Sequence, residues 1–136
     1  MKKILALFLL LALLALPACG GSKQDPIPVK VDELIAAYKE NEARANEMYR
    51  GKTLFILGTV TEIKSSYVNM RDVGGVPNQH LEVNFDKKSK DMKKLSELNV
   101  GDMIAVTGQI QHDYDIRLGY SSQIRIWDCA LVPLPD

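Results

Sequence analysis

The side chains that could carry catalysis or bind a metal are few and widely separated in this sequence. Its two histidines, His80 and His112, are not at the spacing of a metal-binding pair. The sequence has no Gly-x-Ser-x-Gly of a serine hydrolase and no His-Glu-x-x-His of a zinc protease. Gly74-Gly75 is not followed by the lysine and helix that a phosphate-binding loop needs. We therefore predict no catalytic residues, no metal site and no cofactor.

The strongest chemical signal lies at the N-terminus. Two lysines precede the apolar run 4–16, which is shorter than the roughly 20 residues of a membrane-spanning helix and is typical of a secretory signal. The following Leu16-Pro17-Ala18-Cys19 resembles the lipobox of bacterial lipoproteins. This resemblance implies cleavage after a signal peptide of residues 1–18, and a diacylglycerol on the Cys19 thiol. An ordinary signal peptide with a chance cysteine is the alternative.

Acylation of Cys19 would anchor the protein to a membrane, because each buried methylene contributes about 0.8 kcal/mol. We expect a location in the bacterial cell envelope, facing the periplasm or the exterior. Gly20 resembles the signal for release to the outer membrane in a Gram-negative cell. Residues 19–30, rich in Gly, Ser and Pro, are predicted to form a flexible tether. Cys129 then lacks a disulfide partner and is predicted to be a small buried apolar residue.

Composition excludes several classes of protein. The 136 residues suffice for one domain, and 46% of them are hydrophobic, which excludes a disordered chain. Lys+Arg and Asp+Glu each number 17. Removing Lys2 and Lys3 with the signal peptide leaves 15 basic residues against 17 acidic ones. The mature chain therefore lacks the positive field that non-specific nucleic-acid binding needs.

Residues 31–49 are predicted to form one amphipathic helix, because apolar side chains recur there near a 3.6-residue spacing. Asp32 is expected to be its N-cap, and Gly51 is expected to follow its last turn. Glu40 and Arg44 are expected to form an i,i+4 ion pair.

From residue 52 onward, apolar and polar residues alternate. This pattern predicts five strands, at 53–63, 67–72, 80–86, 103–111 and 120–131. Segments 73–79 and 112–119 are predicted to be loops, and the three-residue spacing of apolar residues in 87–99 predicts a short helix. Gly58 and Gly108 mark bends in mid-strand, and a change of alternation near Trp127-Asp128 marks a bulge.

The order helix, three strands, helix, two strands predicts a mainly β fold. It matches a five-stranded Greek-key OB-fold, a partly open β-barrel, over residues 31–136. The barrel would carry an N-terminal amphipathic helix and a short helix between strands 3 and 4. Gly58 and Gly108 would supply the bends that let one long strand serve two parts of the sheet. Another small β-barrel or an α+β roll is the alternative.

Five stretches between residues 31 and 132 carry a resemblance to a known family. They are Asp32 to Glu42, Tyr49-x-Gly51-Lys52, Gly58-Thr59-Val60, Val100-Gly101-Asp102-x-x-x-Val106-x-Gly108 and Asp128-Cys129. They resemble the tRNA_anti-like family of OB-fold bacterial lipoproteins. The resemblance implies the fold and the lipid anchor. It assigns no catalytic residues, and the family name refers to a fold shared with anticodon-binding domains rather than to tRNA binding.

An OB-fold commonly binds its ligand on the face of its second and third strands and on the adjacent loops. Amide side chains pair with hydroxyl groups and tyrosine rings lie against sugar rings, so an envelope glycan or a peptide is the favoured ligand. The candidate ligand-binding residues are Tyr67, Asn69, Arg71, Glu82 and Asn84 on the strands and His112, Tyr114, Arg117 and Tyr120 in the loop before the last strand.

Two other functions stay open. The barrel could dock on another envelope protein while its outer sheet face stays solvated. Single-stranded nucleic acid is the weakest alternative, because it needs several stacking aromatic residues in a basic groove. The predicted strand face has one aromatic residue and charges of both signs.

Overall fold

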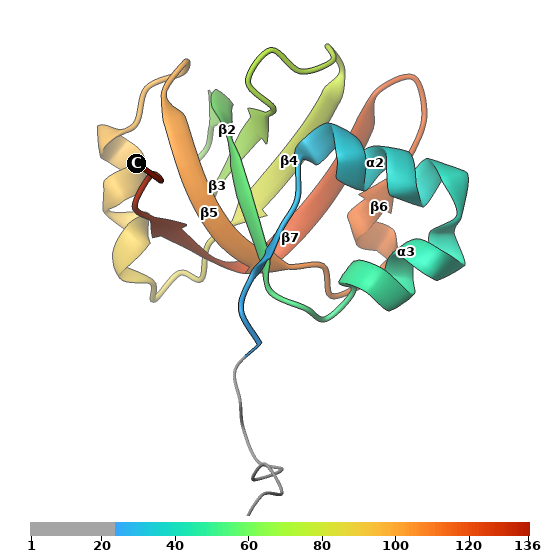
Figure 1. The fold of residues 1–136 in the computed structure, drawn as a ribbon. Helices are drawn as coiled ribbons and strands as arrows, with labels where there is room; N and C mark the ends of the chain where they lie inside the picture. The colour runs from blue at the N-terminus through green and yellow to red at the C-terminus, as the bar shows by residue number, and fades with distance from the viewer. Residues whose placement is uncertain (1–23) are drawn as a thin grey trace, which may run out of the picture.

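The computed structural model describes residues 24–136, and the predicted signal peptide and Cys19 lie outside them. Figure 1 shows the strands curling into a barrel, with one pair of α-helices on one side and two short 3₁₀ helices on the other. The elements in chain order are β1 (Ile27–Pro28), α2 (Val31–Glu40), α3 (Glu42–Tyr49), β2 (Leu54–Ile63), β3 (Tyr67–Arg71), β4 (Gln79–Asn84), η1 (Lys90–Met92), η2 (Lys94–Glu97), β5 (Met103–Gln109), η3 (Asp113–Asp115), β6 (Ile116–Arg117) and β7 (Ser122–Val132).

The barrel closes because β2 pairs with two strands along its length. Its first part, Leu54–Thr59, pairs antiparallel with β5, and its second part, Thr59–Ile63, pairs antiparallel with β3. The remaining order is β3-β4-β7-β5, in which β4 and β7 run parallel. This closed Greek-key order confirms the predicted OB-fold.

Gly58 lies where β2 passes from one partner to the other. A Cβ atom at this position would lie 2.4 Å from the carbonyl oxygen of Arg71 and 2.6 Å from the terminal methyl of Met70. Glycine therefore permits β3 to approach β2 at that point. The bulge in β2 lies further along, at Thr61, where the register with β3 shifts between Val60 and Glu62.

The predicted bulge near the end of the sheet is confirmed. The register between β5 and β7 shifts between Thr107 and Gln109, and Asp128 has a φ of 53°. Gly108 lies opposite this bulge, because a Cβ there would lie 2.6 Å from the sulfur of Cys129. Cys129 is buried, as predicted, and burial raises the pKa of its thiol.

The strand alternation sends every second side chain into one core, as the sequence pattern predicts. Each of these side chains contributes on the order of 1.5–3 kcal/mol by leaving water. The core face of the five long strands consists of Leu54, Ile56, Val60, Val68, Met70, Leu81, Val83, Ile104, Val106, Ile124 and Ile126, all at most 6% exposed.

Residues 31–49 form two helices instead of one. The chain breaks at Asn41, whose backbone is extended and whose side chain caps α3 by accepting a hydrogen bond from Arg44 N at 3.0 Å. The expected pair between Glu40 and Arg44 forms across this break, at 2.7 Å. α3 ends at Tyr49, before Gly51, as expected.

The N-cap predicted for the first helix is wrong. Asp32 lies inside α2, and the cap comes from a distant residue: the Asp72 carboxylate accepts from Val31 N and from Asp32 N, each at 2.8 Å. Asp32 in turn accepts from Val76 N at 3.1 Å. The start of α2 is thereby tied to the loop between β3 and β4.

The α2–α3 pair packs onto the barrel through Leu34, Ile35 and Tyr38, all at most 2% exposed. The Tyr38 hydroxyl donates to Asn46 Oδ1 at 3.1 Å, and burial raises the pKa of Tyr38 to about 12. Gly51 N donates to Ile110 O at 3.0 Å, which joins the end of α3 to the loop after β5.

Three other local predictions differ from the structure. Segment 87–99 forms two short 3₁₀ helices, η1 and η2, instead of one helix. Segment 112–119 contains η3 and the short strand β6, which pairs with β7. Residues 27 and 28, whose composition places them in the tether, form β1 and pair parallel with β2. In each case a contact from elsewhere in the chain organises a segment with a weak local pattern.

We predict that Gly58→Ala destabilises the barrel by about 1–3 kcal/mol, because the new methyl group overlaps the Arg71 carbonyl group. Urea denaturation monitored by circular dichroism measures the change in the free energy of unfolding. Gly119→Ala is the control, because the nearest atom to its Cβ would be 3.9 Å away. Equal stability of the two variants would contradict the role assigned to Gly58.

Candidate ligand-binding face

The outer side of β3, β4 and β7 is polar, and we call it the outer face. Its side chains alternate with the buried core residues, and the strand registers arrange them in rows across the sheet. The outer face comprises Glu62, Tyr67, Asn69, Arg71, His80, Glu82, Asn84, Arg117, Gln123, Arg125 and Trp127.

The first row, the aromatic row, comprises Tyr67, Asn84 and Trp127. Tyr67 lies opposite Asn84, whose amide donates to the carbonyl oxygen of Ile126 at 3.2 Å and so lies beside the start of the β7 bulge. The indole of Trp127 donates to the buried Asp115 carboxylate at 2.8 Å. Two half-buried aromatic rings therefore lie at one end of the outer face.

The second row, the carboxylate row, comprises Glu62, Asn69, Glu82 and Arg125. Asn69 donates to Glu62 at 2.7 Å. Glu82 is 9% exposed and has Arg125 Nε at 3.3 Å, as an ion pair without hydrogen-bond geometry. Glu82 also accepts from Gln123 at 2.8 Å and from Asn84 at 3.1 Å. The nearly buried carboxylate is thus satisfied within the protein.

Glu62 lies at the solvent-exposed end of the carboxylate row, where Lys64 lies 3.0 Å away. The hydrogen bond from Lys64 lowers the pKa of the Glu62 carboxyl, and the same bond raises the pKa of Lys64. Both groups are therefore charged over a wide range around neutral pH. Glu82 pairs with Arg125 within the row, and Glu62 pairs with Lys64 beside it, so the row and Lys64 together carry no net charge.

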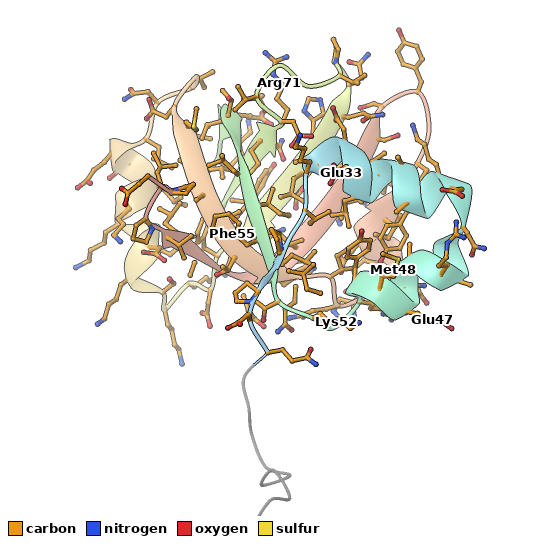
Figure 2. All side chains as sticks on the ribbon, viewed as in Figure 1. Glu33, Glu47, Met48, Lys52, Phe55 and Arg71 are labelled. Carbon is orange, nitrogen blue, oxygen red and sulfur yellow. The ribbon has the colours of Figure 1, made fainter. Side chains whose placement is uncertain are left out.

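The third row, the cationic row, comprises Arg71, His80, Gln123 and Arg117. His80 pairs with Gln123 and Gln123 pairs with Arg117, while Arg71 is one residue beyond the Met70–Leu81 pair and so lies level with His80. Both arginines are exposed. Figure 2 shows Arg71 at the edge of the barrel, where β3 ends.

The structure brings together some of the predicted site residues. Tyr67, Asn69, Arg71, Glu82 and Asn84 share the outer face, and β6 adds Arg117 to it. Asn69, Glu82 and Asn84, however, are engaged in hydrogen bonds with neighbouring side chains. These hydrogen bonds hold the three side chains in place before any ligand binds.

The other three predicted residues do not join the rows. His112 and Tyr114 stack on each other near η3, with ring centroids 4.7 Å apart, while the intervening Asp113 pairs with Arg50 beyond the end of α3. Both residues lie in the predicted flanking loop, and η3 turns this part of the loop toward α3. Tyr120 is 96% exposed, between β6 and β7.

Five residues of the outer face were not predicted from the sequence. The alternation along the strands could have identified them, since positions 123, 125 and 127 alternate with the buried Ile124 and Ile126. Pairing of β7 with β4 then places these positions on the same face as β3 and β4. The missed residues are Glu62, His80, Gln123, Arg125 and Trp127.

The described residues were also considered for a metal site, a membrane-spanning helix and a second groove. Among residues 24–136, no three His, Cys, Asp or Glu side chains lie close enough to hold a metal ion. Helices long and apolar enough to span a membrane are absent from the same residues. A separate groove of about 430 Å³ lies beside β1 and β2, where Figure 2 labels Phe55 and Glu33. Its floor includes Phe55 and Leu57, so it differs chemically from the polar outer face.

We predict that Glu82→Ala lowers the free energy of unfolding by about 1–3 kcal/mol, because Arg125 and the Gln123 amide lose a shared acceptor in a poorly hydrated position. Urea denaturation measures the change. Glu62→Ala, in the same row but with a side chain 46% exposed, should leave the unfolding midpoint unchanged. Equal loss in both variants would show that burial of Glu82 is not the cause.

The chain resembles a number of solved structures. A candidate nucleic acid-binding lipoprotein from Klebsiella pneumoniae matches with a TM-score of 0.62 and 19% identity, over 79% of this chain and 92% of that chain. The Stn1–Ten1 complex of S. pombe matches with a TM-score of 0.44 and 12% identity, over 82% and 79%. Replication protein A of U. maydis bound to single-stranded DNA matches with a TM-score of 0.42 and 13% identity, over 79% and 73%. The first likeness shows a shared fold.

The family comparison covers most of the chain. The tRNA_anti-like family model matches residues 1–117, which confirms the resemblance drawn from the sequence motifs. A comparison with curated proteins gives no match. The matched residues include the barrel strands β2, β3, β4 and β5 and the α2–α3 pair. The chain therefore belongs to the tRNA_anti-like family.

Proposed function

We propose that this protein is a lipid-anchored binding module of the bacterial cell envelope. It binds a saccharide on the outer face and catalyses no reaction. The anchor is the acylated Cys19, and residues 20–26 separate the anchor from β1. The observation that carries the binding proposal is the arrangement of the outer face in three rows, with aromatic rings at one end and hydrogen-bonding groups beside them.

The chemistry of the first two rows suits a saccharide. A sugar hydroxyl both donates and accepts hydrogen bonds, so it can pair with carboxylate and amide groups alike. Apolar faces of sugar rings can lie against Tyr67 and Trp127. Because the hydrogen bonds among Asn69, Glu82 and Gln123 already hold their side chains, binding would cost little side-chain entropy there.

Single-stranded nucleic acid is the second candidate. The cationic row supports it, and the K. pneumoniae neighbour is itself described as a candidate nucleic acid-binding lipoprotein. A strand that crosses the outer face would nevertheless pass its phosphates over Glu62 and Glu82. On the outer face, tyrosine and tryptophan rings for base stacking are confined to one row, whereas such strands need a stacking platform along a basic groove. The saccharide is therefore the better fit.

The anchor can be tested by mass spectrometry of the protein purified from bacterial membranes. We predict that the mature chain begins at Cys19 and carries the mass of a diacylglycerol on its thiol. Cys19→Ala should abolish this modification and the membrane attachment that depends on it. A mature chain that starts elsewhere and carries no lipid would contradict the proposal.

The ligand can be tested with immobilised envelope saccharides. We predict that Tyr67→Ala weakens saccharide binding about tenfold, which corresponds to about 1.4 kcal/mol, while Tyr67→Phe retains most of the affinity because it keeps the ring. Asn99→Ala is the control, because Asn99 lies outside the outer face, before β5. Surface plasmon resonance measures the affinities.

Two results of that experiment would reject the saccharide. One is binding that is identical in all variants. The other is the absence of saccharide binding together with stable capture of an envelope protein, which would favour the docking alternative.

A further inference from the structure

We propose that the cationic row is an anion subsite, so that the outer face selects an acidic saccharide over a neutral one. This inference rests on the proposed saccharide function and adds the chemical class of the ligand. The group recognised is a carboxylate or a phosphate ester on the sugar. The row consists of Arg71, His80, Gln123 and Arg117, on four strands that lie side by side.

Register places the two arginines at opposite ends of the row. From Arg71 the row crosses His80 on β4 and Gln123 on β7, and it ends at Arg117 on β6. With neighbouring strands about 4.8 Å apart, the two backbones are about 14 Å apart. Arginine side chains can bend toward the centre of such a row and bind one anionic group from both sides.

The charges of the cationic row are not neutralised within the described protein. Among residues 24–136, neither Arg71 nor Arg117 has an ion pair with an acidic residue, whereas Lys64 and Arg125 both do. The outer face therefore has its excess positive charge in one row only. An anionic group of the ligand would be attracted to the cationic row. The paired charges of the carboxylate row would exert little net attraction or repulsion on it.

His80 supplies a second, independent observation. Its Nδ1 atom is buried and has no hydrogen-bond partner among the described residues. A buried polar atom without a partner is unfavourable, and most such atoms in proteins are satisfied by a neighbour, a water or a ligand. The atom belongs to the residue between the two arginines. Because the atom is covered, a ligand group on the outer face could satisfy it only after a rotation of the imidazole ring.

Two loops that are held by hydrogen bonds border the cationic row. Residues 72–78 follow Arg71, and residues 118–121 follow Arg117. Ser122 N donates to Asn78 O at 2.8 Å, which joins the end of one loop to the end of the other. The first loop is also held by Asp32, which accepts from Val76 N. Hydrogen bonds therefore hold the loops on both sides of the row, and we expect the backbone positions of its two arginines to be fixed.

The spacing of the rows favours a saccharide over a polyphosphate. The cationic row and the aromatic row are four residues apart along β3, which is about 13 Å. A ligand that spans them would place one anion on the arginines, its hydroxyls on the carboxylate row and a ring against Tyr67. A ligand with a phosphate at every unit would instead meet the carboxylates of Glu62 and Glu82 midway.

The test uses the full chain in detergent and matched pairs of oligosaccharides. The probes are oligogalacturonate and its methyl ester, which differ in charge and by one methyl group on each sugar unit, together with a phosphorylated oligomannose and oligo-dT. We expect oligogalacturonate to bind at least tenfold more tightly than its ester, with an affinity that falls as salt rises. Comparison of oligogalacturonate with the phosphorylated oligomannose distinguishes a carboxylate from a phosphate ester.

The variants are Arg71→Gln, Arg117→Gln and their combination, and Arg44→Gln is the control on the exposed surface of α3. The double variant should lose the preference for the acidic sugar and keep its affinity for the methyl ester. Both arginines are exposed and have no ion pair among residues 24–136, so the melting temperature should not change. If a variant does not fold, the salt dependence of the wild-type protein still tests the proposal.

The outcomes separate the anion subsite from the proposed function. Equal binding of the acid and its ester would overturn the anion subsite and leave saccharide binding intact. Absence of binding to every saccharide would overturn both. Tight binding of oligo-dT that is lost in the double arginine variant would assign the row to nucleic acid and overturn the acidic saccharide. Unchanged preference in the double variant would show that other groups recognise the charge.

Discussion

The closure of the barrel depends on the close approach of β3 to β2 at Gly58. One strand serves two partners, and at the point of transfer there is no room for a side chain beneath the Arg71 carbonyl. This contact fixes the register of β3, and β4 and β7 then follow it across the sheet. Because side chains alternate along each strand, a shift of one residue would exchange the outer face with the core. The three rows are a consequence of that register.

The two glutamates of the carboxylate row differ in burial, and their charges are therefore stabilised in different ways. Glu62 is exposed and pairs with Lys64 in water, whereas Glu82 lies under its neighbours and depends on Arg125 and two amides. The carboxylate row is therefore balanced in charge when Lys64 is included, and hydrogen bonds already orient its side chains. In the part of the chain that the structure describes, the arginines of the adjacent cationic row have no acidic partner. The charge of the outer face therefore changes from one end to the other. The aromatic row at one end is uncharged, and the cationic row at the other end is positively charged.

The N-terminal helices influence the outer face through one carboxylate. Asp72 directly follows β3, and it holds the first backbone N–H groups of α2. The loop that begins with Asp72 reaches β4 beside the cationic row. α2 and α3 thus cover one side of the barrel and also fix the frame of the proposed anion subsite. Residues near position 31 and near position 72 act together there, although they are distant in sequence.

Alternation and glycine position are local signals, and they were enough to predict the five long strands, the core face and the family. The sequence also placed Tyr67 and Asn69 correctly, since their direction follows from the core residues between them. The helix break, the helix cap and the full set of outer-face residues depend on tertiary contacts. Asn41 breaks the helix, Asp72 caps it, and β6 brings Arg117 beside Gln123. Trp127 joins the face through the parallel pairing of β7 with β4. Each of these depends on contacts between distant segments, and a local pattern contains no information on their register.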